Sequence, residues 1–107
     1  MAQFELHKNK GPLKDTIPYV VVVQSSLFDG YRRRVVVPLV KRSALPAAIA
    51  GTRMNPSFQV RGLELVLHPL DIVSVALDQL GECVGSLAEN GQEIADALDE
   101  LLTRSWH

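Results

Sequence analysis

The sequence predicts a small, mainly β fold, an antiparallel barrel with one C-terminal α-helix. Residues 19–24 and 35–40 are two runs rich in valine, and β-branched side chains pack well on a pleated sheet but lose rotamer freedom in a helix. Neither run alternates polar with apolar residues, which is typical of strands covered on both faces. We therefore expect these two runs to be the centre of the fold, and the 107 residues to form a single domain, 1–107.

The chain before the central pair predicts one further strand and a loop. Residues 3–8 alternate polar and apolar side chains, which is typical of a half-exposed strand. Residues 9–18 are polar and contain one glycine and two prolines, so they are expected to form the connecting loop. We interpret His7 as an ordinary surface residue of the first strand.

The ten residues between the central runs combine a turn signal with apolar side chains. Asp29-Gly30 marks the turn, because glycine is free to adopt positive φ. Ser25 stands just before Leu27 and Phe28, which are more apolar than an ordinary solvated loop requires. Two interpretations stay open: these residues form a recognition surface, or Leu27 and Phe28 tuck back onto the barrel rim.

Three consecutive arginines, Arg32, Arg33 and Arg34, open the second central run. They either meet phosphate or a carboxylate-rich partner or form a solvated strand start that discourages edge pairing; we favour the solvated strand start. Pro38 lacks a backbone donor, so the run is expected to meet an edge, a bulge or its own end at that residue.

Residues 41–77 predict an excursion from the sheet and more strands. Residues 44–49 favour a short helix capped by Ser43 and stopped at Gly51. Residues 58–60 and 63–67 indicate a hairpin around Arg61-Gly62, and 72–77 indicate another strand. His68 is followed by proline, which ends the hairpin; we expect this histidine to satisfy a local backbone group.

The C-terminal segment predicts an amphipathic α-helix. Its apolar residues fall on one stripe, at i, i+3, i+4, i+7 and i+8: Ile94, Ala97, Leu98, Leu101 and Leu102. Asn90 with Glu93 offers a capping box, and Ser86 with Glu89 offers an earlier start. Five or more mostly antiparallel strands with a closing helix are typical of a small SH3-like barrel.

Composition limits the classes of function. Acidic and basic residues nearly cancel, 12 against 11, so overall charge does not indicate direct binding of nucleic acid. The mean hydropathy of +0.10 is high for a small soluble monomer and favours a homodimer. No run approaches the ~20 apolar residues of a membrane span, and we expect a cytoplasmic protein.

The sequence contains no recognisable catalytic or metal-binding constellation. His7, His68 and His107 lack the i, i+4 spacing of a zinc pair. Cys83 is the single cysteine, and we interpret it as a small apolar residue that fills the core rather than as a nucleophile. We therefore expect no catalytic residue, no metal and no cofactor, and a binding protein rather than an enzyme.

The run VQSSLFDGYRRRVVVPL resembles the CcdB family, the toxin half of bacterial toxin–antitoxin pairs. Val23-Gln24-Ser25, Asp29, the arginines and Pro38-Leu39 stand at the family spacings without a gap. Further similarity lies in Asp71, Ser74-Val75, Gly81-Glu82, Val84 and Leu87, and in Gln3-Phe4 near the start. Residues 9–18 and 41–57 match poorly.

The resemblance implies a dimeric toxin of the fold class shared by the CcdB and MazF toxins. CcdB-type toxins have no catalysis of their own; they bind the A subunit of DNA gyrase, trap it on cleaved DNA, and serve plasmid maintenance. A cognate antitoxin with a disordered C-terminal segment neutralises them. Family positions that contact gyrase align with these residues: Gln3, Phe4, His7, Ser25, Leu27, Asp99 and Leu102. Gln3, Phe4 and Ser25 keep the family residue and Leu27 stays aliphatic, whereas His7, Asp99 and Leu102 differ.

The tail departs from the family pattern. The family ends in Trp-Gly-Ile, whereas this chain ends in Ser105-Trp106-His107, with Trp106 displaced by about one helical turn. We expect Trp106 to serve as the anchor of the gyrase interface, since a buried indole often dominates binding. Two alternatives are kept: an endoribonuclease toxin of the same fold class that uses Asp29 and the arginines, and a homologue that binds antitoxin without poisoning gyrase.

Overall fold

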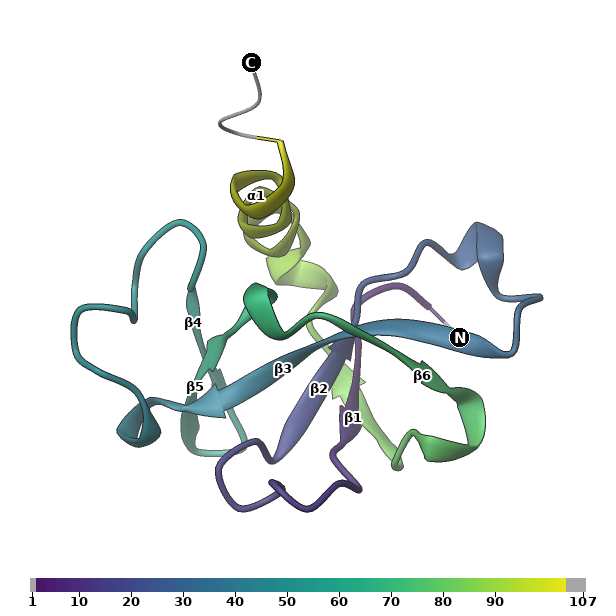
Figure 1. Cartoon of the computed structure of the whole chain (residues 1–107), viewed down its shortest axis with the longest axis horizontal. Helices are drawn as coiled ribbons and strands as arrows, with labels where there is room; N and C mark the ends of the chain where they lie inside the picture. The colour runs from purple at the N-terminus through teal and green to yellow at the C-terminus, as the bar shows by residue number, and fades with distance from the viewer. Residues whose placement is uncertain (1, 104–107) are drawn as a thin grey trace.

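The fold is an antiparallel sheet that curls into a half-barrel, followed by one C-terminal helix (Figure 1). The computed structural model describes residues 2–103. Its strands and helix are β1 (Glu5–Lys8), β2 (Tyr19–Val22), β3 (Arg33–Lys41), β4 (Ser57–Val60), β5 (Leu63–Leu67), β6 (Val73–Ala76), β7 (Cys83–Ser86) and α1 (Gly91–Leu102). The strand order is β4-β5-β3-β2-β1-β7, and β6 pairs with β3 outside this path. The predicted mainly β fold with a C-terminal helix is confirmed.

The central strands β2 and β3 are buried on both faces. Val21 pairs with Val37 and Val22 with Val36, and all four are at most 1% exposed. Val21 and Val37 belong to the core that α1 covers with Ile94. Val36 faces the other way, towards a cavity shared with the loop 9–18 and with β6. Two covering layers explain why neither run alternates polar with apolar residues.

Pro38 lies inside β3, where the neighbouring strand changes. Val23 of the chain after β2 donates its backbone N–H to the carbonyl oxygen of Val35 at 3.0 Å, so the backbone groups of Val35 face β2. Successive residues of a strand point their backbone groups to alternate sides, and the nitrogen of Pro38, three residues later, therefore points away from β2. On that other side, β3 pairs with β6 up to Val36 and with β5 from Leu39. Pro38 therefore lies between the two partner strands, where its lack of a backbone N–H breaks no hydrogen bond of the sheet. The sequence predicted an edge, a bulge or the end of the strand at Pro38; the structure has a change of partner strand there, and β3 continues to Lys41.

The predicted helix over 44–49 is wrong. A 3-10 turn covers Arg42–Ala44, and Leu45 is extended, with φ −119° and ψ 150°. Leu45 precedes Pro46, and the residue before a proline is sterically disfavoured in helical geometry. The chain then proceeds by turns, including Gly51 at φ 83°. The alanine content of the segment favours a helix, but Pro46 disfavours helical geometry at Leu45.

The hairpin β4–β5 follows its turn residues. Arg61 and Gly62 both have positive φ, 51° and 82°, as a two-residue type I′ turn requires. The register Val60↔Leu63 confirms the predicted hairpin. A 3-10 turn, Pro69–Asp71, then leads into β6.

Helix α1 begins at Gly91, which is its first residue and not an interior one. Ile94 and Ala97 are fully buried, as the stripe predicts, but Leu102 is 67% exposed because it lies in the last turn beyond the sheet. The side chain of Asn90 makes no capping bond to the backbone; it donates to Glu93 at 3.2 Å. A 3-10 turn, Ala88–Asn90, precedes the helix.

Gly81 is the tightest glycine of the described chain. A Cβ built there would lie 2.3 Å from the backbone oxygen of Lys8. Gly81→Ala is therefore expected to lower the free energy of unfolding by about 1–3 kcal/mol, measured by urea denaturation. Gly85→Ala is the matched control in β7, because a Cβ at Gly85 meets nothing within 4 Å. Equal losses in both variants would contradict this explanation.

Candidate functional site

The segment 25–31, named the rim segment here, presents exposed apolar side chains. Leu27 is 87% exposed, Phe28 51% and Tyr31 68%. The rings of Phe28 and Tyr31 lie in a tilted pair, with 6.3 Å between their centroids and 52° between their planes. The alternative in which Leu27 and Phe28 tuck back onto the barrel is therefore wrong, and the rim segment is a surface available to a partner.

Local hydrogen bonds fix the shape of the rim segment. Ser25 accepts the backbone N–H of Leu27 at 3.2 Å through Oγ, and a 3-10 turn follows over Ser26–Phe28. Gln24 donates to the carbonyl oxygens of Phe28 and Arg33, both at 3.2 Å, and accepts the N–H of Val35 at 3.0 Å. Gly30 does not adopt the positive φ available to it. The apolar side chains are thus presented by a backbone that is already ordered.

Arg34 supports the rim segment from below. Its side chain is only 5% exposed and donates to the carbonyl oxygens of Tyr31 at 2.6 Å and Asp29 at 3.0 Å. The carboxylate of Asp29 lies 3.7 Å from the same guanidinium. The expectation of a solvated strand start is wrong for Arg34, because its side chain is buried. The five N–H donors of its planar guanidinium suit a turn in which several carbonyl oxygens face inward.

The neighbouring arginines have different environments. Arg33 donates to Oγ of Ser74 at 2.8 Å and to its backbone oxygen at 2.7 Å, which ties β3 to β6. Arg32 is exposed. Two of the three guanidinium groups are therefore occupied by the fold, which leaves little of the arginine cluster for a phosphate.

Gln3 and Phe4 lie beside the strand end that leads into the rim segment. Gln3 donates through Nε2 to the carbonyl of Val23 at 3.0 Å. Phe4 has φ 69°, a region that costs a non-glycine residue energy. Its backbone is held from both sides, since its N–H donates to Val22 at 2.6 Å and its carbonyl accepts from Leu87 at 2.8 Å.

The ring of Phe4 accounts for the glycine at the start of α1. A Cβ on Gly91 would approach that ring to 2.7 Å. The N-terminal turn and the helix start are therefore packed together, and the strained backbone of Phe4 is fixed by these neighbours.

The predicted gyrase-contact residues fall into two groups. Gln3, Phe4, Ser25 and Leu27 gather at one end of β2, whereas Asp99 and Leu102 lie in the C-terminal half of α1. Asp99 is about 12 Å along the helix axis from Gly91, at 1.5 Å per residue. Trp106, together with Ser105 and His107, lies outside the described residues.

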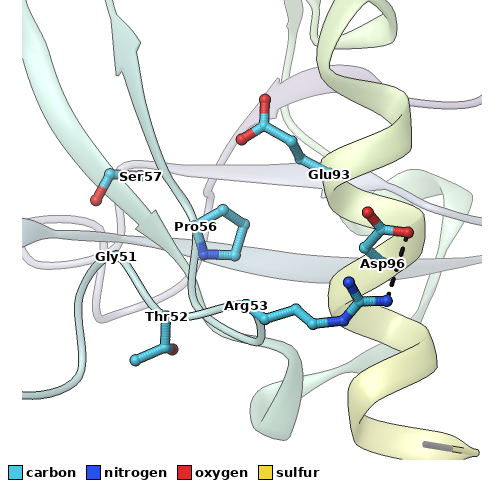
Figure 2. A pocket seen from close by; sticks show the side chains of 7 residues that line it. All are labelled: Gly51, Thr52, Arg53, Pro56, Ser57, Glu93 and Asp96. Atoms are coloured by element: carbon cyan, nitrogen blue, oxygen red, sulfur yellow. Dashed lines mark ion pairs between the residues drawn. The ribbon is translucent and has the colours of Figure 1, made fainter.

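Arg53 joins the helix-end group to the excursion 42–56. Its guanidinium lies 3.7 Å from Asp96, 3.8 Å from Asp99 and 3.4 Å from Glu100. Figure 2 shows Arg53 extending towards α1 across a pocket of about 420 Å³, with Glu93 and Asp96 on the helix side. Asp99 also accepts from the hydroxyl of Thr103. The acidic face of the helix is therefore neutralised in part by the chain itself.

Replacing Arg53 with glutamine is expected to change the free energy of unfolding by less than about 1 kcal/mol, because exposed ion pairs contribute little. The change should shrink further in high salt, which screens exposed charges. Urea denaturation at low and high salt measures both effects. A loss that is large and independent of salt would mean that Arg53 stabilises the fold by packing.

Three interpretations of single residues need correction. His7 is 4% exposed, not a surface residue, and its Nδ1 lies 2.9 Å from the carbonyl oxygen of Gly81. Cys83 is exposed, not a core residue. The ring nitrogen Nδ1 of His68 lies 3.0 Å from the carboxylate of Asp71, not on a backbone group. Sequence reasoning missed these environments because they depend on the pairing of β1 with β7 and on one turn.

The carboxylate of Glu5 is also perturbed. Burial acts to raise its pKa, but the hydrogen bond from the backbone of Ala2 and the neighbouring His7 outweigh it and hold the pKa below the ordinary value. Glu5 is therefore kept ionised beside His7.

The described residues form a curled antiparallel half-barrel with one C-terminal helix, a fold consistent with that of the small barrel toxins, and they carry an exposed apolar rim. The family model of the CcdB protein matches residues 3–103, nearly the whole chain. The chain therefore belongs to the CcdB family, the toxins of toxin–antitoxin pairs. No curated protein matches it. Within residues 2–103, none of the helices has the length and hydropathy needed to cross a bilayer.

Proposed function

We propose that this chain is the toxin of a type II toxin–antitoxin pair and that it inhibits DNA gyrase by binding its A subunit. The toxin acts in the cytoplasm as a homodimer of one domain, without catalysis of its own. A cognate antitoxin, through a disordered C-terminal segment that folds on binding, neutralises it. Family membership over residues 3–103 is the observation that carries this proposal.

The rim segment supports docking as the mode of action. Leu27, Phe28 and Tyr31 present apolar and aromatic surface of the kind that anchors interfaces. Because hydrogen bonds already order the backbone beneath them, little conformational entropy is lost on binding. Gln3 and Phe4 extend this surface at the same end of β2.

The helix end supplies the second contact. Leu102 is 67% exposed at the end of α1, and Trp106 follows it by four residues in the sequence. An exposed leucine and an indole on one chain end suit a tip that enters a pocket of the enzyme. Asp99 supplies the polar rim of this contact.

The experiment that tests the proposal is a supercoiling and DNA-cleavage assay with purified chain and gyrase from the same organism. The intact chain should inhibit supercoiling and accumulate cleaved DNA, and Trp106→Ala should weaken both effects. An RNA substrate in parallel tests the ribonuclease alternative. The proposal would be overturned if the chain neither inhibited supercoiling nor accumulated cleaved DNA, and instead cleaved RNA or only bound antitoxin.

A further inference from the structure

A cluster of three potential metal ligands lies between β1 and the edge strand β7. It comprises the carboxylate of Glu5, the imidazole of His7 and the thiol of Cys83, whose ligand atoms all lie within 4.8 Å of one another. Strand pairing brings them together, because His7 is opposite Cys83 in the β1–β7 register. The register shifts between Leu6 and His7, the kind of irregularity that re-aims a side chain.

The ring of His7 is held so that Nε2 faces the cluster. Nδ1 lies 2.9 Å from the carbonyl oxygen of Gly81, and because that oxygen only accepts, Nδ1 carries the proton. In the neutral ring, Nε2 then has a lone pair, 3.3 Å from Oε1 of Glu5. Nε2 of His7 and Oε1 of Glu5 therefore converge in a place where His7 is 4% exposed. A cation placed between these two atoms would be coordinated by both of them.

The two ligands on β1, Glu5 and His7, already have the supporting hydrogen bonds of a metal site. Oε2 of Glu5 accepts the backbone N–H of Ala2 at 3.0 Å, which leaves Oε1 towards His7. His7 donates its other nitrogen to the Gly81 carbonyl. Metal-binding histidines and carboxylates are usually oriented by such outer hydrogen bonds. Gly81 is fixed in turn by its close approach to the backbone of Lys8.

We propose that Glu5, His7 and Cys83 bind a zinc ion, with water as the fourth ligand. Thiolate and imidazole select zinc over magnesium or calcium. Bonds of about 2.0–2.1 Å place two tetrahedral ligands about 3.3–3.4 Å apart, and Nε2 and Oε1 are separated by 3.3 Å. The exposed thiol of Cys83 reaches the ion by rotation of its side chain and leaves the fourth position open to water. Metal binding is measured without gyrase, so this proposal can fail or succeed separately from the proposed gyrase activity.

The test uses the untagged, reduced full chain and cobalt(II) as a spectroscopic probe for zinc. One equivalent of cobalt should bind with a thiolate-to-cobalt charge-transfer band, and zinc should displace it. Zinc should also raise the Tm of the intact chain. Absence of the charge-transfer band would overturn the proposal.

Variants separate this site from chance binding to a thiol. Cys83→Ser and His7→Gln each remove a direct ligand and should each weaken metal binding by about 100-fold or more. Loss of a residue that only hydrogen-bonds to a ligand weakens metal binding by about 10- to 100-fold. His68→Gln is the matched control, because His68 pairs with Asp71 elsewhere, and it should bind like the intact chain. Cys83→Ser alters an exposed side chain, so it tests the site without unfolding the protein. A band that is lost in Cys83→Ser but kept in His7→Gln would overturn the proposal.

Discussion

Arg34→Met is expected to destabilise the fold by about 3–5 kcal/mol, because the buried guanidinium donates several charge-assisted hydrogen bonds, each worth about 1.5–3 kcal/mol. Methionine retains much of the apolar side chain but removes every donor. The carbonyl oxygens of Asp29 and Tyr31 would lose their guanidinium partner, and so would the carboxylate of Asp29. Urea denaturation followed by circular dichroism measures the loss.

Two further variants define the cause. Arg32→Met removes a neighbouring exposed arginine and should change the stability by no more than about 0.5 kcal/mol. Arg34→Lys keeps the charge but not the planar fork, so it should recover only part of the loss. If Arg34→Met and Arg32→Met were equally mild, the buried hydrogen bonds of Arg34 would not support the rim segment.

Periodicity and turn residues predicted the fold well. The valine-rich runs gave the sheet centre because burial on both faces removes the need for polar alternation. Arg61-Gly62 gave a hairpin because its backbone requires positive φ. The helix predicted over 44–49 is absent. The prediction rested on the alanine content of the segment, but the steric effect of Pro46 holds Leu45 in an extended conformation.

The candidate site was less accessible to sequence reasoning because its environments come from distant contacts. Arg34 and Arg32 look equivalent in the sequence, yet one is buried under a turn and the other is exposed. His7 and Cys83 meet because β1 pairs with β7, and no local pattern indicates that pairing. The exposure of Leu27, left open by the sequence, depends on the 3-10 turn that Ser25 supports.

Leu27→Asp tests whether the rim segment contacts gyrase. Leu27 is 87% exposed, so the substitution should leave the folding stability within about 0.5 kcal/mol of the original. In an interface, the same change would bury a carboxylate against apolar surface without a partner. We expect inhibition of supercoiling to weaken by at least about 30-fold, which corresponds to about 2 kcal/mol of binding free energy.

Leu13→Asp is the control for this substitution. Leu13 is also exposed, at 60%, but it lies in the loop 9–18 that enters β2, whereas Leu27 follows the other end of that strand (Figure 1). The two variants add the same charge at opposite ends of β2, so a general effect on solubility or net charge would weaken both equally. Selective loss in Leu27→Asp places gyrase on the rim segment. Full inhibition by Leu27→Asp would instead assign the contact to the helix end, with Leu102 and Trp106.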